Sequence, residues 1–416
     1  MKKLFMILML TAALAACHSY DDHDPMQIDR PVIDRTVIIY MAAENDLSVH
    51  GWNNLNDIRE GSKKLSANQC LLVYVDRSHE TELPWLGRFQ GGQLTDSVSI
   101  SDMGISQHDE YASDSRVFED VLRYAVNHFH ASQDYGLVLW GHSTGWLLED
   151  SIPRTRGYGF DNGHNDRTTP TGYYLNIPTM NQILKRIPAH WSYIFADCCL
   201  FTCLESAYEM RNTVDYIVGS VAEIPGQGAP YSKIIPDMFL PAEMACKTIA
   251  DKYYANCSEA QPFAVIKNCE MDQLASATRT ALQVISDNID DAYPDMNGII
   301  HYLYTDFHIM WGYRPEYSMF YDAGDFIKHH TPQEVYASWR QAYDRAVIHK
   351  LMATRWRTAI PWGGFYDNFK ITEESYHGVS MFVPQDPRRG RYAKLNEDIK
   401  RLTWWNAVYE GSKWDE

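Results

Sequence analysis

The sequence predicts an α/β fold in which a mostly parallel β-sheet is covered by helices on both faces. Several short runs of apolar residues have the composition of strands that are buried on both sides, as the strands of parallel sheets are. Segments with helical periodicity separate these runs along the chain. Strand and helix therefore alternate, which is the order that a parallel sheet with crossover helices requires.

The first predicted strand comprises residues 36–41 and is followed by a polar turn. A polar helical stretch over residues 52–65 leads to a second strand at residues 71–75, which stops at Asp76. Residues 86–101 alternate and contain glycine, a pattern more typical of a hairpin than of a crossover helix.

The next segments continue the alternation. Ser113 and Asp114 can cap a helix that has one apolar face. A strand, a polar loop, a helix and a strand are then predicted in this order, at residues 137–140, 148–171, 179–187 and 193–196.

The second half of the chain has no chemical motif of its own. We expect residues 35–231 to form the main domain and residues 232–416 to form an α/β extension packed on it. Two helices and one strand are predicted there, at residues 272–289, 334–348 and 376–384. The chain shows no internal repeat.

The N-terminus is expected to direct export. Two lysines precede an apolar run that is too short for an ordinary membrane span and typical of a signal peptide, here residues 1–16. The run ends in LAAC, which resembles the lipobox of bacterial lipoproteins, so Cys17 is the predicted lipidation site. An acidic tether follows at residues 17–34. A buried apolar helix with an incidental cysteine is the alternative. The lipid would hold the protein on the outer membrane or cell surface.

Composition excludes one class of partner. The chain has 416 residues, of which 45% are hydrophobic and 22% charged, as in ordinary folded proteins. Its formal net charge of −17 would repel nucleic acid, and it could attract basic polypeptides. Among the 8 cysteines no pair has zinc-finger spacing, so we expect no metal site.

Two predicted strands end in residues that can do chemistry. One is followed by Gly141, His142 and Ser143, and the other by Asp197, Cys198 and Cys199. Sites in open parallel sheets form where the strands end, so these two segments could converge.

The first segment formally satisfies the serine nucleophile motif of α/β-hydrolases, G-x-S-x-G, which would make Ser143 the nucleophile of an esterase. That motif requires a helix directly after the serine. Here Trp146 and Pro153 leave little room for one, so this hypothesis is the weaker of the two.

The second hypothesis is a His–Cys dyad. A thiol needs a nearby base to become a good nucleophile, and a histidine at an adjacent strand end supplies one. Caspase-type peptidases place the histidine roughly 50 residues before the cysteine, which His142 and Cys199 approximate. Singly, each residue is more often structural; together at two strand ends they favour catalysis.

Several segments resemble the clostripain family of cysteine peptidases. The sequence LVLWGHSTGW around His142 resembles the family's histidine motif, and DCCL, continued by ESAYE, resembles its nucleophile motif. YMAAENDL at residues 40–47 resembles its first strand and turn, and residues 215–231 and 378–384 resemble later segments. The resemblance covers nearly all of the mature chain and implies a caspase-like fold.

The resemblance also implies roles for individual residues. His142 would be the general acid and base, and Cys199 the nucleophile. The backbone N–H groups of Ser143 and Cys199 would stabilise the oxyanion. Asp197 would lie at the floor of the pocket that selects arginine or lysine, since a buried carboxylate pairs well with these side chains. Further substrate-binding positions would be Asn45, Ala222 and Glu223.

The sequence departs from the family pattern at two positions. Ser143 stands where the family usually has glycine, and Cys198 stands where it usually has alanine or serine. Cys198 and Cys203 are therefore lesser candidates for the nucleophile. A surface lipoprotein that keeps the fold only to bind polypeptides or glycans is the non-enzymatic alternative.

We expect a monomeric endopeptidase whose partners are polypeptides with basic residues. We expect no cofactor, although the resemblance alone would admit calcium. Family members often cut themselves at a basic residue between the two motifs, which makes Arg154 and Arg156 the candidates for autoprocessing; Arg167 lies in the same loop.

Overall fold

A computed structural model describes most of the chain after the tether. The described residues are 32–78, 83–105, 111–148, 157–161, 163, 173–257, 261–289, 293–302, 318–354, 356–357, 365–366, 371–389 and 392–415. The predicted signal peptide, Cys17, Arg154, Arg156 and Arg167 lie outside them. Among the described residues, no helix is both long and apolar enough to cross a membrane.

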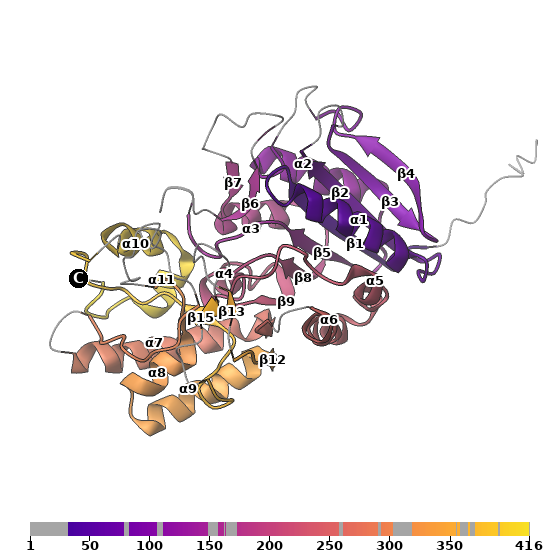
Figure 1. Ribbon diagram of the computed structural model, residues 1–416. Coiled ribbons are helices and arrows are strands. Elements are labelled where there is room, and N and C mark those ends of the chain that lie inside the picture. Colours follow the sequence, from indigo (N-terminus) through magenta and orange to yellow (C-terminus); the bar gives the residue numbers. More distant parts are fainter. Residues whose placement is uncertain are drawn as a thin grey trace, which may run out of the picture. The chain divides into compact units, whose positions relative to one another are not determined.

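The described residues contain one nine-stranded sheet with the strand order β12-β10-β9-β8-β5-β1-β2-β3-β4 (Figure 1). Its strands are β1 (Arg35–Ala43), β2 (Gln69–Arg77), β3 (Trp85–Gln90), β4 (Gln93–Ser99), β5 (Asp134–Trp140), β8 (Trp191–Asp197), β9 (Val214–Ser220), β10 (Phe263–Lys267) and β12 (Val347–Leu351). The five central strands from β9 to β2 are parallel. The predicted hairpin is confirmed, because β3 pairs antiparallel with β2 and β4.

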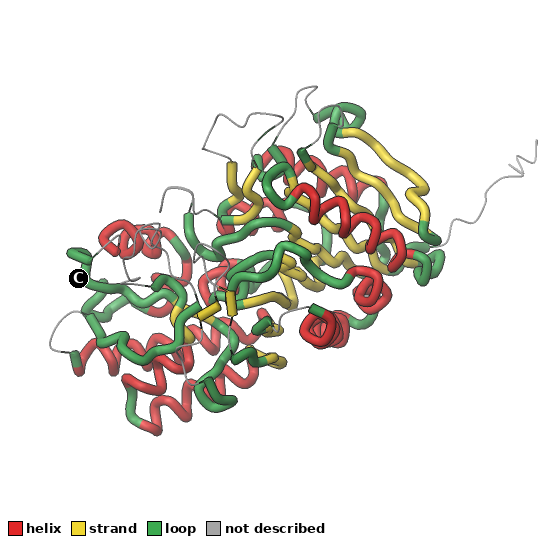
Figure 2. Tube along the Cα trace, in the orientation of Figure 1, coloured by secondary structure: helices red, strands yellow, loops and turns green. Residues whose placement is uncertain are grey.

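Helices cover both faces of this sheet (Figure 2). Every residue of β1 is buried, and its side chains alternate between two apolar cores: Ile38 and Tyr40 belong to one, Val37 and Ile39 to the other. The first core includes side chains of α2 (Ser115–His128), α3 (Ile177–Arg186), α4 (Leu204–Glu209), α7 (Met271–Asn288), α8 (Ala323–His330), α9 (Gln333–Ala346), α10 (Tyr392–Asp398) and α11 (Thr403–Val408). The second includes side chains of α1 (Ser48–Ser62), α5 (Tyr231–Ile234) and α6 (Ala242–Asn256).

Most predicted helices lie within a few residues of their expected places. The predicted cap of α2 is Asp114, whose side chain accepts a hydrogen bond from the backbone N–H of Arg116. The polar loop predicted at residues 148–171 contains a strand, because β6 (Tyr158–Asp161) pairs with β7 (Tyr173–Leu175). Two further short pairs are β11 (Tyr321–Asp322) with β15 (Ser380–Met381), and β13 (Trp356–Arg357) with β14 (Phe365–Tyr366).

The strand predicted at residues 376–384 is wrong for most of its length, since only the two residues of β15 are extended and paired. Gly378 has φ +71°, which interrupts a strand. The backbone N–H of Phe382 donates to the Glu205 carboxylate rather than to another strand. The apolar character of this segment therefore reflects burial against neighbouring elements.

The sheet crosses the predicted domain boundary. β10 and β12 come from the C-terminal part and pair antiparallel, β10 with β9 and β12 with β10. Residues Val32–Glu416 form one compact unit. The division at residues 231 and 232 stays a prediction.

Candidate active site

The segments that contain His142 and Cys199 follow two neighbouring strands of the sheet. β5 and β8 are parallel neighbours, and their last residues, Trp140 and Asp197, are paired in register. Gly141 continues from Trp140 with its N–H 3.4 Å from the carbonyl oxygen of Asp197. A side chain at Gly141 would place its Cβ 2.9 Å from the carbonyl oxygen of Ala42, so the close approach of these backbones requires glycine.

His142 is held by a carboxylate from a third strand end. Its Nε2 lies 2.7 Å from Oδ1 of Asp46, which follows β1. The hydrogen bond to His142 is the main reason why the pKa of Asp46 lies below its ordinary value. The ring of Phe160, on β6, stands edge-on with its centroid 6.2 Å from that of His142.

Cys199 lies in a strained turn at the end of β8. The next residue, Leu200, has φ +59° and is the one non-glycine residue with positive φ among the described residues. Its N–H donates to the carbonyl oxygen of Ala222 over 3.1 Å. The backbone N–H of Ile224 donates to the Cys199 sulfur over 3.4 Å.

The Cys199 thiol is neutral at neutral pH. Burial raises its pKa to about 12, and the nearby Glu223 carboxylate adds to this effect. No hydrogen bond joins His142 to Cys199 in the described part of the chain. Attack by this sulfur therefore requires a base to take its proton during the reaction.

The geometry of Ser143 does not suit a nucleophile. The residue is 5% exposed, and its hydroxyl accepts a hydrogen bond from the N–H of Gly145. Residues 141–148 contain no helix, which the serine motif of α/β-hydrolases requires. Cys198 and Cys203 are fully buried, whereas Cys199 is partly exposed.

Asp197 is a buried carboxylate directly beside this turn. It is 3% exposed, and its Oδ2 accepts hydrogen bonds from the N–H of Ala229 over 2.9 Å and from the hydroxyl of Tyr231 over 2.8 Å. Burial raises its pKa to about 6, so it is ionised at neutral pH. Its Oδ1 has no hydrogen-bond partner among the described residues.

Residues 227–229 lie against the Asp197 carboxylate, and side chains of β5 and α1 hold this segment in place. The Trp140 indole donates to Oδ1 of Asn54 over 2.7 Å, and the Asn54 amide donates to the carbonyl of Gln227 over 2.9 Å. Gly228 follows with φ +66°, and a Cβ there would lie 2.9 Å from Oδ2 of Asp197. Backbone and carboxylate can approach this closely only because the residue is glycine.

The remaining predicted binding residues lie at the same edge. Asn45 is buried, and its side chain accepts from the N–H of Leu47 over 2.8 Å and donates to the carbonyls of Ala42 and Phe160. The other two, Ala222 and Glu223, lie in the segment after β9 that contacts the Cys199 turn. The structure thus brings all the predicted catalytic and binding residues to one edge of the sheet.

One group of described residues could hold a metal ion, and the sequence analysis missed it. Glu44, Asp76 and Asp161 are buried, and one oxygen of each lies within 4.8 Å of the others. The N–H of Ala112 donates to Asp76 and Asp161. Carboxylate oxygens suit calcium, which takes six to eight oxygen ligands. Glu44 follows β1, and Asp76 lies near the end of the neighbouring strand β2. Two acidic residues at adjacent strand ends were the sequence signal that could have predicted this site.

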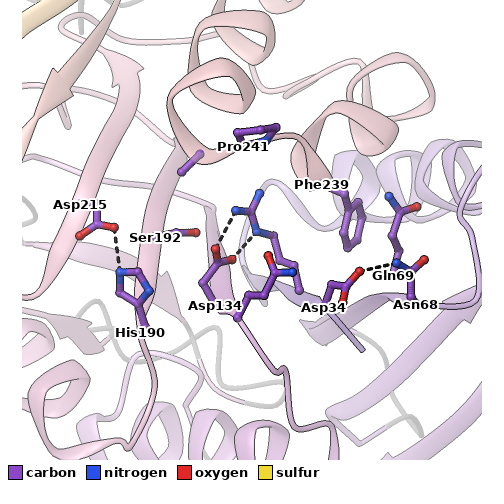
Figure 3. Close-up of a pocket in the computed structure, with 12 residues that line it drawn as sticks. Asp34, Asn68, Gln69, Asp134, His190, Ser192, Asp215, Phe239 and Pro241 are labelled. Atoms are coloured by element: carbon purple, nitrogen blue, oxygen red, sulfur yellow. Dashed lines mark hydrogen bonds and ion pairs between the residues drawn. The ribbon is translucent and has the colours of Figure 1, made fainter. Parts of the chain in front are cut away.

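A cavity of about 450 Å³ lies at the opposite edge of the sheet and contains none of the predicted site residues (Figure 3). It is lined by residues at the starts of β1, β2, β5, β8 and β9, and by Phe239, Pro241 and Ala242 around the start of α6. Its charged groups already have partners: Arg35 contacts Asp134, His190 contacts Asp215 over 2.8 Å, and Asp34 accepts a hydrogen bond from the Asn68 amide.

Comparisons with known proteins point to one family. The model of the clostripain family matches residues 39–416. An inactive zymogen of a C11 protease from Parabacteroides distasonis is 28% identical, with 91% of this chain and 99% of that chain covered and a TM-score of 0.73. A secreted C11 cysteine protease from Bacteroides thetaiotaomicron, in complex with an irreversible peptide inhibitor, is 24% identical over 90% of this chain and 98% of that chain, with a TM-score of 0.69. No curated protein matches the chain. The predicted fold class is confirmed.

Proposed function

Because this chain belongs to the clostripain family of cysteine peptidases, we propose that it is an endopeptidase that cleaves polypeptides after arginine or lysine. The observation that supports this specificity best is the carboxylate of Asp197. It is buried two residues before Cys199, ionised at neutral pH, and one of its oxygens has no hydrogen-bond partner among the described residues.

His142 and Cys199 would carry out the bond cleavage. The Cys199 thiol is protonated at neutral pH, so His142 would accept its proton as the sulfur attacks the scissile carbonyl carbon. The resulting imidazolium would donate that proton to the leaving amine, which departs and leaves a thioester on Cys199. Water activated by His142 would then release the acid and restore the thiol.

Two backbone N–H groups are available for the negatively charged oxygen of the tetrahedral intermediate. Neither Ser143 nor Cys199 donates its N–H in a hydrogen bond within the described residues. The residues on either side of Ser143 are already hydrogen-bonded. The N–H of Thr144 donates to the carbonyl of Gly157, and the carbonyl of His142 accepts from the N–H of Gly159. This arrangement fixes the segment while leaving the N–H of Ser143 for an oxyanion.

Asp197 would pair with the guanidinium or ammonium group of the substrate. An ionised, desolvated carboxylate favours these cations over neutral side chains. Asn45 would line the same pocket as Asp197, and Ala222 and Glu223 would border the substrate backbone.

Export and processing belong to the same proposal. The LAAC sequence supports lipidation at Cys17 and an anchored location on the outer membrane or cell surface, and a similar C11 protease is described as secreted. Arg154 or Arg156 would be the site at which the protein cuts itself.

A cleavage profile on a mixed peptide library tests the proposal. Wild type should cut after arginine and lysine, and Cys199→Ala should cut nowhere. Cleavage after unrelated residues would remove the assigned specificity, and cleavage by Cys199→Ala would remove the assigned nucleophile.

A further inference from the structure

We infer that Asp46 is a positioning residue for His142. Its carboxylate holds the imidazole by Nε2, so that Nδ1 is the nitrogen that exchanges protons with Cys199 and with the leaving amine. This inference rests on the proposed function, because it assumes that His142 is the general acid and base.

Asp46 is placed by a firmly bonded turn. Asn45 accepts the N–H of Leu47 with its side chain and the N–H of Ser48 with its carbonyl over 3.2 Å, so Asp46 lies between two fixed residues. α1 begins immediately afterwards. Because β1 and β5 are parallel neighbours, with Met41 opposite Trp140, Asp46 and His142 leave the same edge of the sheet.

The charge of Asp46 decides which ring nitrogen carries the proton. The Asp46 side chain is 78% exposed, and an exposed aspartate is an ionised carboxylate at neutral pH, which can only accept a hydrogen bond. The hydrogen between them must therefore sit on Nε2 of His142. In the neutral ring this leaves Nδ1 as a lone-pair acceptor, and Nδ1 makes no hydrogen bond to any described residue.

Such an arrangement matches what a general base needs. The ring nitrogen opposite the carboxylate must be unprotonated to accept the thiol proton, and the carboxylate must stabilise the imidazolium that forms. The Cys199 thiol makes this help necessary, because its own raised pKa supplies almost no thiolate at neutral pH.

The position of this pair, rather than its distance, marks it as functional. His190 with Asp215 and His349 with Asp251 both have similar distances of 2.8 Å. Asp215 lies at the start of β9 and lines the cavity at the opposite edge of the sheet (Figure 3), whereas Cys199 follows the end of the neighbouring parallel strand β8. Asp215→Asn therefore removes a similar His–Asp contact without touching the proposed site, which makes it a matched control.

The test compares Asp46→Asn, Asp46→Glu, Asp215→Asn and wild type on one arginine-containing peptide. The corresponding buried aspartate of serine peptidases is worth about 10⁴-fold in kcat, and Asp46 is largely exposed, so we expect kcat of Asp46→Asn to fall about 10- to 100-fold. KM should change less than about twofold, because the carboxylate does not bind substrate. Asp46→Glu should recover much of the loss, and Asp215→Asn should match wild type.

Alkylation of Cys199 by iodoacetamide at neutral pH gives a second readout, and Asp46→Asn should slow it. The Asp46 side chain is 78% exposed, so asparagine there leaves the core intact, which a thermal melt would verify. Wild-type kcat in Asp46→Asn, a change in KM alone, or a loss that Asp46→Glu does not reduce would overturn the positioning role. Turnover by His142→Ala or Cys199→Ala would instead overturn the proposed function, whatever Asp46→Asn does.

Discussion

At the scale of single residues, we propose that Asp197 determines the preference for arginine or lysine. Asp197→Asn keeps an oxygen to accept the hydrogen bonds from Ala229 and Tyr231, so the fold should survive. Loss of one member of a desolvated charge pair costs about 2–5 kcal/mol, so kcat/KM for an arginine peptide should fall on the order of 10²-fold or more. Peptides with arginine or leucine before the cut would be compared. A variant that prefers arginine by the original margin would place the determinant elsewhere.

The same residue predicts a pH dependence. Burial raises the pKa of Asp197 to about 6, and only its ionised form pairs with a cation. The preference of wild type for arginine over leucine should therefore weaken as pH falls through about 6. A ratio of the two kcat/KM values that stays constant from pH 5 to pH 8 would contradict this role.

Glu223 should restrain the reactivity of Cys199. After burial, its charge is the largest contribution to the raised pKa of the thiol. Glu223→Gln should lower that pKa and speed alkylation by iodoacetamide at pH 8, since thiolate is the reacting form. Glu60→Gln, which removes a surface carboxylate paired with Lys63, is the control. Equal rates for the two variants would show that Glu223 does not act on the thiol.

At the scale of elements, the segment over Asp197 depends on one glycine. Gly228→Ala combines a left-handed backbone with a Cβ placed 2.7 Å from Oδ1 of Asn54 and 2.9 Å from Asp197. Gly91→Ala has a similar φ of +58° with nothing within 4 Å, so it isolates the strain of the backbone alone. That strain is worth about 1–2 kcal/mol. Gly228→Ala should lower Tm by more than Gly91→Ala and also reduce arginine cleavage; equal effects would mean that the close contact is unimportant.

The elements also show which parts of the structure the sequence can predict. Central strands such as β1 and β5 were predictable because strands buried on both faces appear as unbroken apolar runs. The same signal misled at residues 376–384, where burial comes from packing and Phe382 binds a carboxylate. His142 and Cys199 were selected from strand ends and family motifs, and their catalytic roles stay predictions. The contact between Asp46 and His142 could not be predicted, because it joins residues 96 positions apart through side-chain geometry.

At the scale of the whole molecule, Glu205 couples stability to pH. It lies in α4, and its carboxyl group accepts the N–H of Phe382 from the C-terminal part. Burial raises its pKa to about 8, so the folded protein holds this proton more tightly than the unfolded chain does. Its contribution to stability is therefore full below about pH 4 and is lost as pH rises through about 8, with a slope of up to about 1.4 kcal/mol per pH unit.

Glu205→Gln should reduce that slope, because glutamine keeps an acceptor oxygen and does not ionise. Urea unfolding of both proteins at pH 5 and pH 8 would measure it. The difference between the two pH values should be smaller in the variant. An unchanged difference would assign the pH dependence to other groups.

Self-cleavage after Arg154 or Arg156 would divide the chain into two fragments. Mass spectrometry should find wild type cut after Arg154 or Arg156 and Cys199→Ala intact. Loops are cut easily by any protease, so the comparison with Cys199→Ala is the control. The same fragments from both proteins, or an uncut but active wild type, would remove autoprocessing.

The identity of the nucleophile is the central claim, and one comparison tests it most directly. kcat/KM for a single arginine peptide would be measured for wild type, Cys199→Ala and Ser143→Ala. An intact binding site can still accelerate hydrolysis about 10³-fold over water without a nucleophile, so the variants must be compared with each other. Cys199→Ala should lose turnover and Ser143→Ala should retain most of it. A larger loss in Ser143→Ala, with wild type still active after alkylation, would contradict the assignment of Cys199.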